Sequence, residues 1–186
     1  LLRDSGRVLM SVRALRGLYR EFASLVCRLV DVESVVILTK NDDQFCQVYP
    51  PISDGMECLG CTDALTKLLM ESAEPLPKYS LERGRPTPER TAALEAMESR
   101  SLQLAAPVWG SNGMEAIILL GSRTAGLFFG RQEIEIVRTL CGQMAFALVN
   151  ARLYTEVEDA KLYNEILLEN LSSGVIACDA ERHITL

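Results

Sequence analysis

The sequence predicts an α+β fold, in which a central antiparallel sheet is flanked by helices. Two observations lead to this prediction. Strand-like runs come in consecutive pairs joined by short turns rather than alternating with helices, which favours antiparallel pairing. Long amphipathic stretches without proline begin and end the chain, and we expect these two helices to pack together. With 186 residues, of which 48% are hydrophobic, the chain is large enough to bury a core.

The first helix is expected to begin near Asp4 or Ser5, which suit an N-cap, and to end near residue 29 or 30. Its apolar residues recur at alternating steps of three and four, as in a heptad seam. They are Val8, Val12, Leu15, Tyr19, Phe22, Val26 and Leu29. The arginine-rich opposite face fits a solvated surface, attraction to anionic lipid headgroups, or pairing with the acidic end of the last helix.

Residues 34–39 (SVVILT) and 45–49 (FCQVY) are expected to form a hairpin around an Asn-Asp-Asp turn. Residues 53–61 are interpreted as loop. Thr62 or Asp63 then caps a helix that runs to about residue 72, because Pro75 and Pro77 prevent its continuation. We expect a short strand at residues 79–82 and a helix at residues 89–98, with Pro88 in its first turn.

The strongest strand signals are residues 102–109 and 114–122, joined by a four-residue loop at 110–113. Residues 116–120 are continuously apolar, so both faces of that strand should be covered. Pro107 cannot donate a ladder hydrogen bond, which indicates a sheet edge or a bulge there.

Residues 131–171 contain no proline and one glycine, Gly142, and predict a helix roughly 60 Å long. Up to about residue 149 we expect it to pack on its own sheet and on the first helix, with Val137, Leu140, Met144 and Leu148 facing inward. Beyond that its heptad seam has a stutter between Leu153 and Val157 and a polar position at Asn164, which favours two strands. The seam is Phe146, Val149, Leu153, Val157, Ala160, Asn164, Leu167 and Leu171. With Val12, Leu15, Tyr19 and Phe22 of the first helix, it predicts a parallel homodimer.

Charge and hydropathy exclude several classes of protein. The net charge of −6 argues against nucleic-acid binding. No apolar run approaches the ~18 residues needed to cross a membrane. The chain begins at Leu1 rather than Met, so we expect a piece of a longer protein, whose upstream part is compatible with membrane attachment. The six cysteines lie mostly in apolar patterns and favour reduced thiols in the cytoplasm over a disulfide scaffold.

Few residues of the chain suit catalysis. His183 is the only histidine and lies in the C-terminal tail, so the globular part has neither a Cys–His pair nor the usual general base. No phosphate-binding glycine loop is present. Cys58 and Cys61 form a CxxC spacing, which fits half of a zinc site, a redox pair, or cysteines of a loop and core. No cofactor is evident.

Residues 9–153 resemble a GAF domain. The matching features are the first helix followed by SVVILT and FCQVY, the Arg100-Ser101-Leu102 and Ala106-Pro107-Val108 runs, the strand that ends at Gly121, and the close at 150–154 (NARLY). Residues 169–186 resemble the opening of a PAS domain, with Asn170, Gly174, Val175, Ile176 and Asp179 at its first strand and turn. The resemblance divides the chain into a GAF-like domain at 1–153, a signalling helix at 154–171 and the start of a PAS-like domain at 172–186.

The resemblance implies a non-catalytic, cytoplasmic sensory module of a signal-transduction protein, of the two-component sensor histidine kinase type. A small-molecule or protein signal would pass through the dimeric helix to PAS and kinase domains of the same chain. The implied ligand pocket includes Cys58, Cys61, Thr62, Arg83, Arg85 and Trp109, although Trp109 also fits a core aromatic at the hairpin end. Two alternatives remain: a cysteine-dependent reductase or metal-binding GAF domain using Cys58 and Cys61, and a dimerisation spacer without a ligand.

Overall fold

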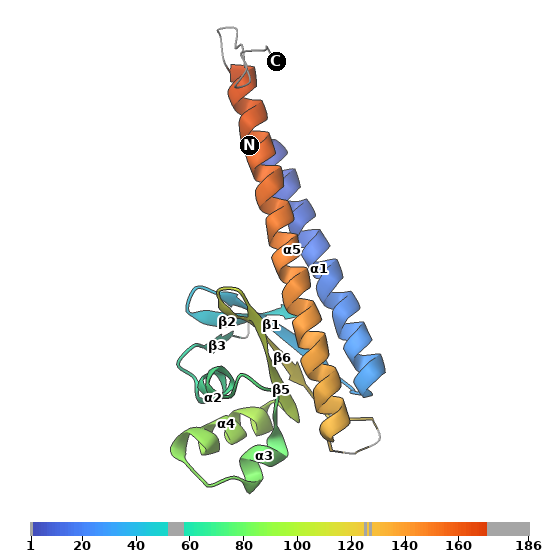
Figure 1. The fold of residues 1–186 in the computed structure, drawn as a ribbon, viewed down its shortest axis with the longest axis vertical. Coiled ribbons are helices and arrows are strands. Elements are labelled where there is room, and N and C mark those ends of the chain that lie inside the picture. Colours follow the sequence, from blue (N-terminus) through green and yellow to red (C-terminus); the bar gives the residue numbers. More distant parts are fainter. Residues whose placement is uncertain (1, 52–57, 125, 127, 171–186) are drawn as a thin grey trace, which may run out of the picture. The chain divides into compact units, whose positions relative to one another are not determined.

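The computed structural model describes residues 2–51, 58–124, 126 and 128–170 (Figure 1). The chain divides into two compact units, Leu1–Val149 and Asn150–Leu186. The first unit contains the whole sheet and all helices except the distal part of the last one. That helix, α5 (Arg131–Asn170), continues across the division.

Six strands form one antiparallel sheet in the order β3-β2-β1-β6-β5-β4. The strands are β1 (Val35–Asn41), β2 (Gln44–Tyr49), β3 (Cys58–Gly60), β4 (Leu76–Pro77), β5 (Leu104–Gly110) and β6 (Gly113–Leu120). The predicted strands β1 and β6 are direct neighbours at the centre of the sheet, with Ile37 opposite Ile118. Both predicted hairpins are confirmed, β1 with β2 and β5 with β6.

The two faces of the sheet carry two separate apolar clusters, because successive side chains of a strand point to opposite faces. In β6, Ala116, Ile118 and Leu120 face one cluster, while Ile117 and Leu119 face the other. This two-sided burial explains why residues 116–120 are apolar without alternation.

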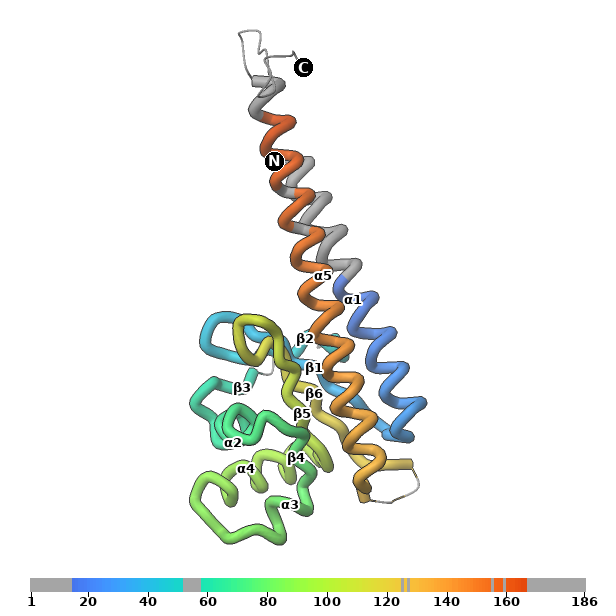
Figure 2. Tube along the Cα trace, in the orientation of Figure 1, coloured from blue at the N-terminus to red at the C-terminus, as the bar shows by residue number. Residues whose placement is uncertain are grey.

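The helix-pair cluster lies between the sheet, the helix α1 (Leu2–Val30) and the part of α5 up to Val149 that belongs to the first unit (Figures 1 and 2). Val137, Leu140 and Met144 are buried in it and Leu148 packs against it, so the predicted inward face of the last helix is confirmed.

The short-helix cluster covers the opposite face. It is formed by the helices α2 (Ala64–Ser72), α3 (Lys78–Arg83) and α4 (Pro88–Ser99). Asp63 is the N-cap of α2, and Thr87 caps α4 by accepting a hydrogen bond from the Arg90 N–H. Pro88 occupies the first turn of α4 as predicted.

Four local predictions are wrong. The first helix already begins at Leu2, so Asp4 and Ser5 are not its N-cap. Residues 79–82 lie in the helix α3 instead of a strand, because β4 ends at Pro77 and the chain turns into a helix directly after it. Residues 58–60 of the predicted loop form the edge strand β3. The β5–β6 loop has two residues instead of four, because Gly110 pairs with Gly113.

Pro107 pairs with Ile117 of β6 on one side, whereas β4 pairs only with Leu104 and Ala105 on the other. Its missing N–H therefore lies beyond the end of the edge strand, and a register shift follows between Val108 and Trp109. The predicted edge position is confirmed.

The second unit contributes the distal part of α5, which is helical up to Asn170. The predicted start of a PAS-like domain at 172–186, including His183, lies outside the described residues. Within the described part of the chain, every helix is too short or too polar to cross a bilayer.

Candidate functional site

Cys58 and Cys61 do not form a pair. Cys58 lies in β3 directly opposite Cys46 of β2 and is joined to it by a disulfide, with 4.2 Å between the two Cα atoms. Cys61 is a free thiol that packs against the short-helix cluster, and its N–H donates to the Asp43 carbonyl. Within the described residues, no group of three or more His, Cys, Asp or Glu side chains could hold a metal ion.

The expectation that the cysteines stay reduced is wrong for this pair. The antiparallel register places Cys46 and Cys58 at the close cross-strand distance, and the interpretation of residues 53–61 as loop concealed that pairing. Cys27, Cys61 and Cys141 are free thiols.

The other residues of the predicted pocket are dispersed over the surface. Thr62 is exposed at the start of α2, and Arg85 is exposed in the α3–α4 connection. Trp109 stands at the hairpin end of β5 with 39% of its surface exposed, so the expectation of a core aromatic is wrong. Arg83 ends α3, with its guanidinium carbon 6.0 Å from the centroid of the Tyr79 ring.

The space between the sheet and the short helices is lined by closely packed apolar side chains. Phe45, Leu65 and Met97 are fully buried there. Thr66 of α2 is the buried polar residue of this region, and its hydroxyl has no hydrogen-bond partner among the described residues.

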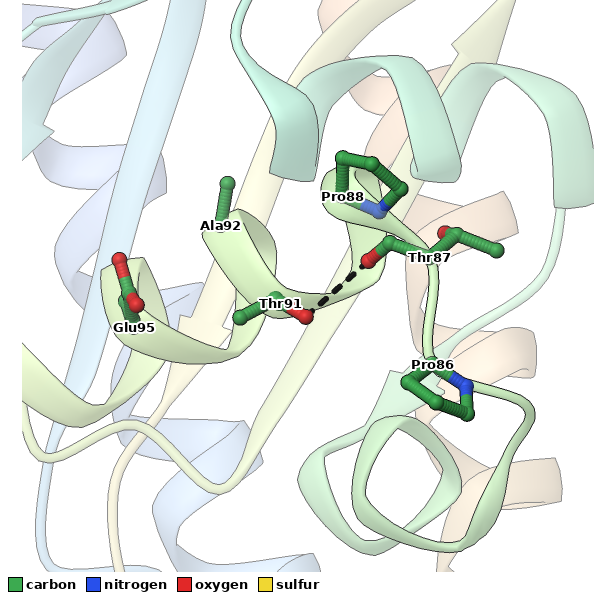
Figure 3. A pocket seen from close by; sticks show the side chains of 6 residues that line it. All are labelled: Pro86, Thr87, Pro88, Thr91, Ala92 and Glu95. Carbon is green, nitrogen blue, oxygen red and sulfur yellow. Dashed lines mark hydrogen bonds between the residues drawn. The ribbon is translucent and has the colours of Figure 1, made fainter.

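A hollow of about 460 Å³ lies at the start of α4 (Figure 3). Proline rings of Pro86 and Pro88 form one side, and Thr91 donates from its hydroxyl to the Thr87 carbonyl, 3.1 Å away. All these side chains are exposed, and Glu95 is the charged residue among those that line the hollow. The hollow therefore has no cationic side chain among its lining residues that would pair with an anionic ligand.

A half-buried arginine, which was not predicted from the sequence, joins the ends of the two long helices at the rim of the sheet. Arg123 follows β6 and donates from Nε to the Val30 carbonyl at 3.2 Å, where α1 ends. Its Nη1 donates to the Phe128 carbonyl at 3.3 Å and lies 3.1 Å from a carboxylate oxygen of Glu133, in the first turn of α5. We call these four residues the rim junction.

Glu133 has a second role in the rim junction. Its other carboxylate oxygen accepts the Gly130 N–H at 2.9 Å, which caps the start of α5. Next to it, the Thr124 N–H donates to the Asp31 carbonyl, so the segments that leave α1 and enter α5 are tied together. An arginine three residues after a continuously apolar strand was the available signal in the sequence.

Burial raises the pKa of three titratable groups of the helix pair, which are Tyr19, Cys27 and Cys141. Desolvation raises the pKa of Tyr19, partly offset by its hydrogen bond with Thr39. Desolvation raises the pKa of the Cys141 thiol to about 12, so this thiol is neutral and unreactive near neutral pH.

Comparisons with known proteins agree on the fold. Neither a protein-family model nor a curated protein matches the sequence. Solved structures do match. A GAF domain/HD domain protein from Geobacter sulfurreducens is 15% identical with a TM-score of 0.58, over 76% of this chain and 96% of that one. The GAF domain of a phosphoenolpyruvate-protein phosphotransferase from Coxiella burnetii is 15% identical with a TM-score of 0.56, over 83% of this chain and 96% of that one. The GAF domain of a two-component sensor histidine kinase from Bacillus halodurans is 14% identical with a TM-score of 0.53, over 75% and 96%. This chain has the GAF fold.

In this GAF fold, the predicted dimer residues of α1 are partly used within the chain itself. Tyr19 and Phe22 are buried in the helix-pair cluster, and Leu15 packs against it. The side chain of Val12 lies outside the described residues.

The seam of α5 is accessible instead. Phe146, Leu153 and Val157 expose 70%, 53% and 67% of their surfaces. Ala160 and Asn164 are also exposed, Val149 is half-buried, and the side chain of Leu167 lies outside the described residues.

The GAF unit also has a groove of about 370 Å³ between α1 and α5. It is lined by apolar side chains of both helices and by polar side chains of α5. Its lining residues are Leu25, Leu29, Gln132, Glu135, Ile136, Thr139, Leu140 and Gln143.

Proposed function

We propose that this chain is a non-catalytic, cytoplasmic sensory input module of a signal-transduction protein, of the sensor histidine kinase type. In this proposal two copies associate in parallel through α5 and pass the state of the GAF unit to PAS and kinase domains further along the chain. The GAF fold supports the coarse role, since the solved structures with this fold include domains of sensor kinases and other signalling proteins.

One observation carries the dimer: the large apolar side chains that α5 leaves exposed at heptad spacing. Phe146, Leu153 and Val157 lie at steps of seven and four residues and are each more than half exposed. Because these side chains are already partly buried, burying their remaining exposed surface in two copies contributes about 6–11 kcal/mol. That is comparable with the roughly 4–15 kcal/mol cost of bringing two chains together. A second copy is therefore a sufficient partner for the seam.

The relay would begin at the rim junction. Arg123 bonds the last turn of α1, the loop carbonyl of Phe128 and the first turn of α5. A change in the position of Phe128 would therefore alter the contacts of Arg123 with the end of α1 and the start of α5 together. We propose that a signal bound by the GAF unit changes the dimeric helix through this connection.

The oligomeric state tests the proposal. Sedimentation equilibrium at micromolar concentrations should give the mass of a dimer. Leu153→Asp should give a monomer, because it places a charge in the seam. Tyr154→Asp is the matched control: it adds the same charge at a neighbouring exposed position outside the seam, and it should remain a dimer. A wild-type monomer at these concentrations contradicts the proposal.

Cross-linking tests the orientation. Val157→Cys and Asn164→Cys should each form a symmetric disulfide between copies. In an antiparallel pair, only a position at the crossing point meets its own copy, so both variants cannot cross-link.

The Cys46–Cys58 disulfide favours a second candidate function, a redox-responsive GAF domain. A cellular dithiol would reduce the disulfide to two thiols and itself become a disulfide. Disulfides that occur in the cytosol are usually transient or redox-sensing. In this candidate the redox-active pair is Cys46 and Cys58, whereas the CxxC spacing in the sequence suggested Cys58 and Cys61. Cys46→Ser should therefore abolish the redox response, and Cys61→Ser should leave it intact. An unchanged response in Cys46→Ser refutes this candidate.

A further inference from the structure

A cleft of about 310 Å³ lies between α3 and the segment that enters α5. Its lining residues are Tyr79, Glu82, Arg83, Phe128 and Phe129. Arg83 is the one member of the predicted ligand pocket that lines it. The cleft is therefore a different place from the packed apolar region between the sheet and the short helices.

Two aromatic rings form the apolar part of the cleft. Phe128 is 75% exposed, although its neighbour Phe129 is buried in the helix-pair cluster. The Phe128 ring meets the Tyr79 ring edge to face, with 6.4 Å between centroids and 83° between planes. This contact holds a large apolar side chain in solvent, where a further ring can pack against it.

The two charged side chains of the cleft, Glu82 and Arg83, differ in whether they form an ion pair. Glu82 forms an ion pair with Lys78 at 3.5 Å. Arg83 lies over the Tyr79 ring, and no carboxylate of the described residues lies within ion-pair distance of its guanidinium. Stacking on an aromatic ring leaves the N–H groups at the edge of the guanidinium free to bind a carboxylate with two parallel hydrogen bonds.

We propose that this cleft binds a small aromatic carboxylate. Its ring packs against Tyr79 and Phe128, and its carboxylate pairs with Arg83. The volume lies at the lower end of the range for ligand sites, which suits a ligand of one or two rings. The inference rests on the proposed sensory function and adds to it a ligand class and an entry point for the signal.

The cleft is directly connected to the rim junction. The Phe128 carbonyl accepts a hydrogen bond from Arg123, whose guanidinium also pairs with Glu133 of α5. Gly130, two residues after Phe128, is capped by the same Glu133. A ligand that holds the Phe128 ring therefore constrains the backbone where α5 begins.

Naphthoate is the probe for the test, and binding to this chain is followed by NMR titration. The wild type should bind at millimolar concentration or below, and the amide signals of Gly130 and Glu133 should shift. Arg83→Gln should weaken binding at least about tenfold, because a charge-assisted hydrogen bond is lost. Phe128→Ala should weaken it as well without unfolding the protein, since the ring is exposed. Naphthylmethanol, which lacks the charge, should bind as weakly to the wild type as naphthoate binds to Arg83→Gln.

Arg85→Gln is the matched control, because Arg85 is an exposed arginine in the next turn of chain that does not line the cleft. Absence of binding, or equal loss in the Arg83 and Arg85 variants, overturns the inference. Sedimentation of the same samples keeps the two proposals separate. A dimer without naphthoate binding refutes the cleft and retains the sensory helix, whereas a monomer that binds naphthoate does the reverse.

Discussion

Replacing Arg123 by methionine should destabilise the GAF unit more than replacing any exposed arginine of the chain. The side chain of Arg123 is only 13% exposed and makes three interactions, with the Val30 carbonyl, the Phe128 carbonyl and Glu133. Methionine keeps much of the length and apolar contact of the arginine stem but has none of its donors. The substitution therefore removes the hydrogen bonds and the ion pair and leaves most of the packing in place.

The expected loss follows from the contacts. Each hydrogen bond from a charged donor contributes about 1.5–3 kcal/mol, and the two carbonyls retain partial access to water. The ion pair adds less, about 1 kcal/mol, because Glu133 is 24% exposed and solvent screens it. Taking both hydrogen bonds at the lower end of this range, because water reaches the two carbonyls, we expect a total loss of about 4 kcal/mol in the free energy of unfolding.

Urea denaturation measures that free energy, and Arg138→Met is the matched control. Arg138 is 51% exposed and pairs with Glu74 at 2.6 Å on the surface, so its replacement should cost less than about 1 kcal/mol. Glu133→Gln should cost about 1 kcal/mol, because the amide oxygen can still cap Gly130. A loss below about 1 kcal/mol for Arg123→Met refutes the assignment of the rim junction as the link between the helices.

Two further predictions concern the cysteines. Since the pKa of Cys141 rises from 9.0 to about 12 on folding, the folded chain binds more protons than the unfolded chain between these values. The stability contributed by the neutral thiol is complete below pH 9 and is lost as the pH approaches 12. The wild type should lose up to about 4 kcal/mol over this range, and Cys141→Ala should lose less, as measured by alkaline unfolding curves. Thiol titration of the denatured protein should detect two more thiols after reduction than before it, since the Cys46–Cys58 disulfide occupies two cysteines. Cys46→Ser should lower the free energy of unfolding by about 3 kcal/mol relative to the oxidised wild type, given a separation of 12 residues. An equal loss relative to the reduced wild type contradicts the disulfide.

The elements that the sequence predicted well are those whose pattern is local and long. The last helix was predicted to one residue at its C-terminal end, because forty residues without a breaker leave no alternative. The central strands β1 and β6 were found because β-branched and apolar runs bounded by turn residues are a strong signal. The short elements failed: β3 has three residues, which is too few for any periodicity, and α3 has six between a proline and a glycine.

The candidate site could be predicted only in part, because its residues meet through tertiary structure. Arg83 was selected from its loop context, and its place in a cleft depends on Phe128, which is far away in the sequence. The CxxC spacing drew attention to Cys61, whereas the actual partner of Cys58 is set by the register of an unpredicted strand. The role of Arg123 could not be predicted from the sequence, because it depends on where α1 ends beside the sheet.

Substitution of Gly142, which lies in the part of α5 that packs on the sheet, tests whether α5 pairs with a second copy. Apart from its chain neighbours and the backbone of its own helix, a methyl group at this position would meet no atom of the described residues within 4 Å. In a lone helix, Gly142→Ala should therefore stabilise the chain by about 0.5–1 kcal/mol, because alanine loses less backbone entropy on folding. Gly142 also lies four residues before Phe146, which places it on the face of the exposed seam. If two copies meet along this face, glycine marks a close approach, and the added methyl group should weaken the dimer.

Gly17→Ala supplies the reference, since Gly17 of α1 also has no atom within 4 Å of an added methyl group. We expect Gly17→Ala to raise stability with no change in the dimer dissociation constant. In the monomeric Leu153→Asp background, Gly142→Ala should raise the stability by a similar amount. As a single substitution in the wild-type dimer, Gly142→Ala should increase the dissociation constant. Stabilisation of both forms by Gly142→Ala, with unchanged dissociation, would mean that the copies do not meet at Gly142 and that the seam begins only beyond it.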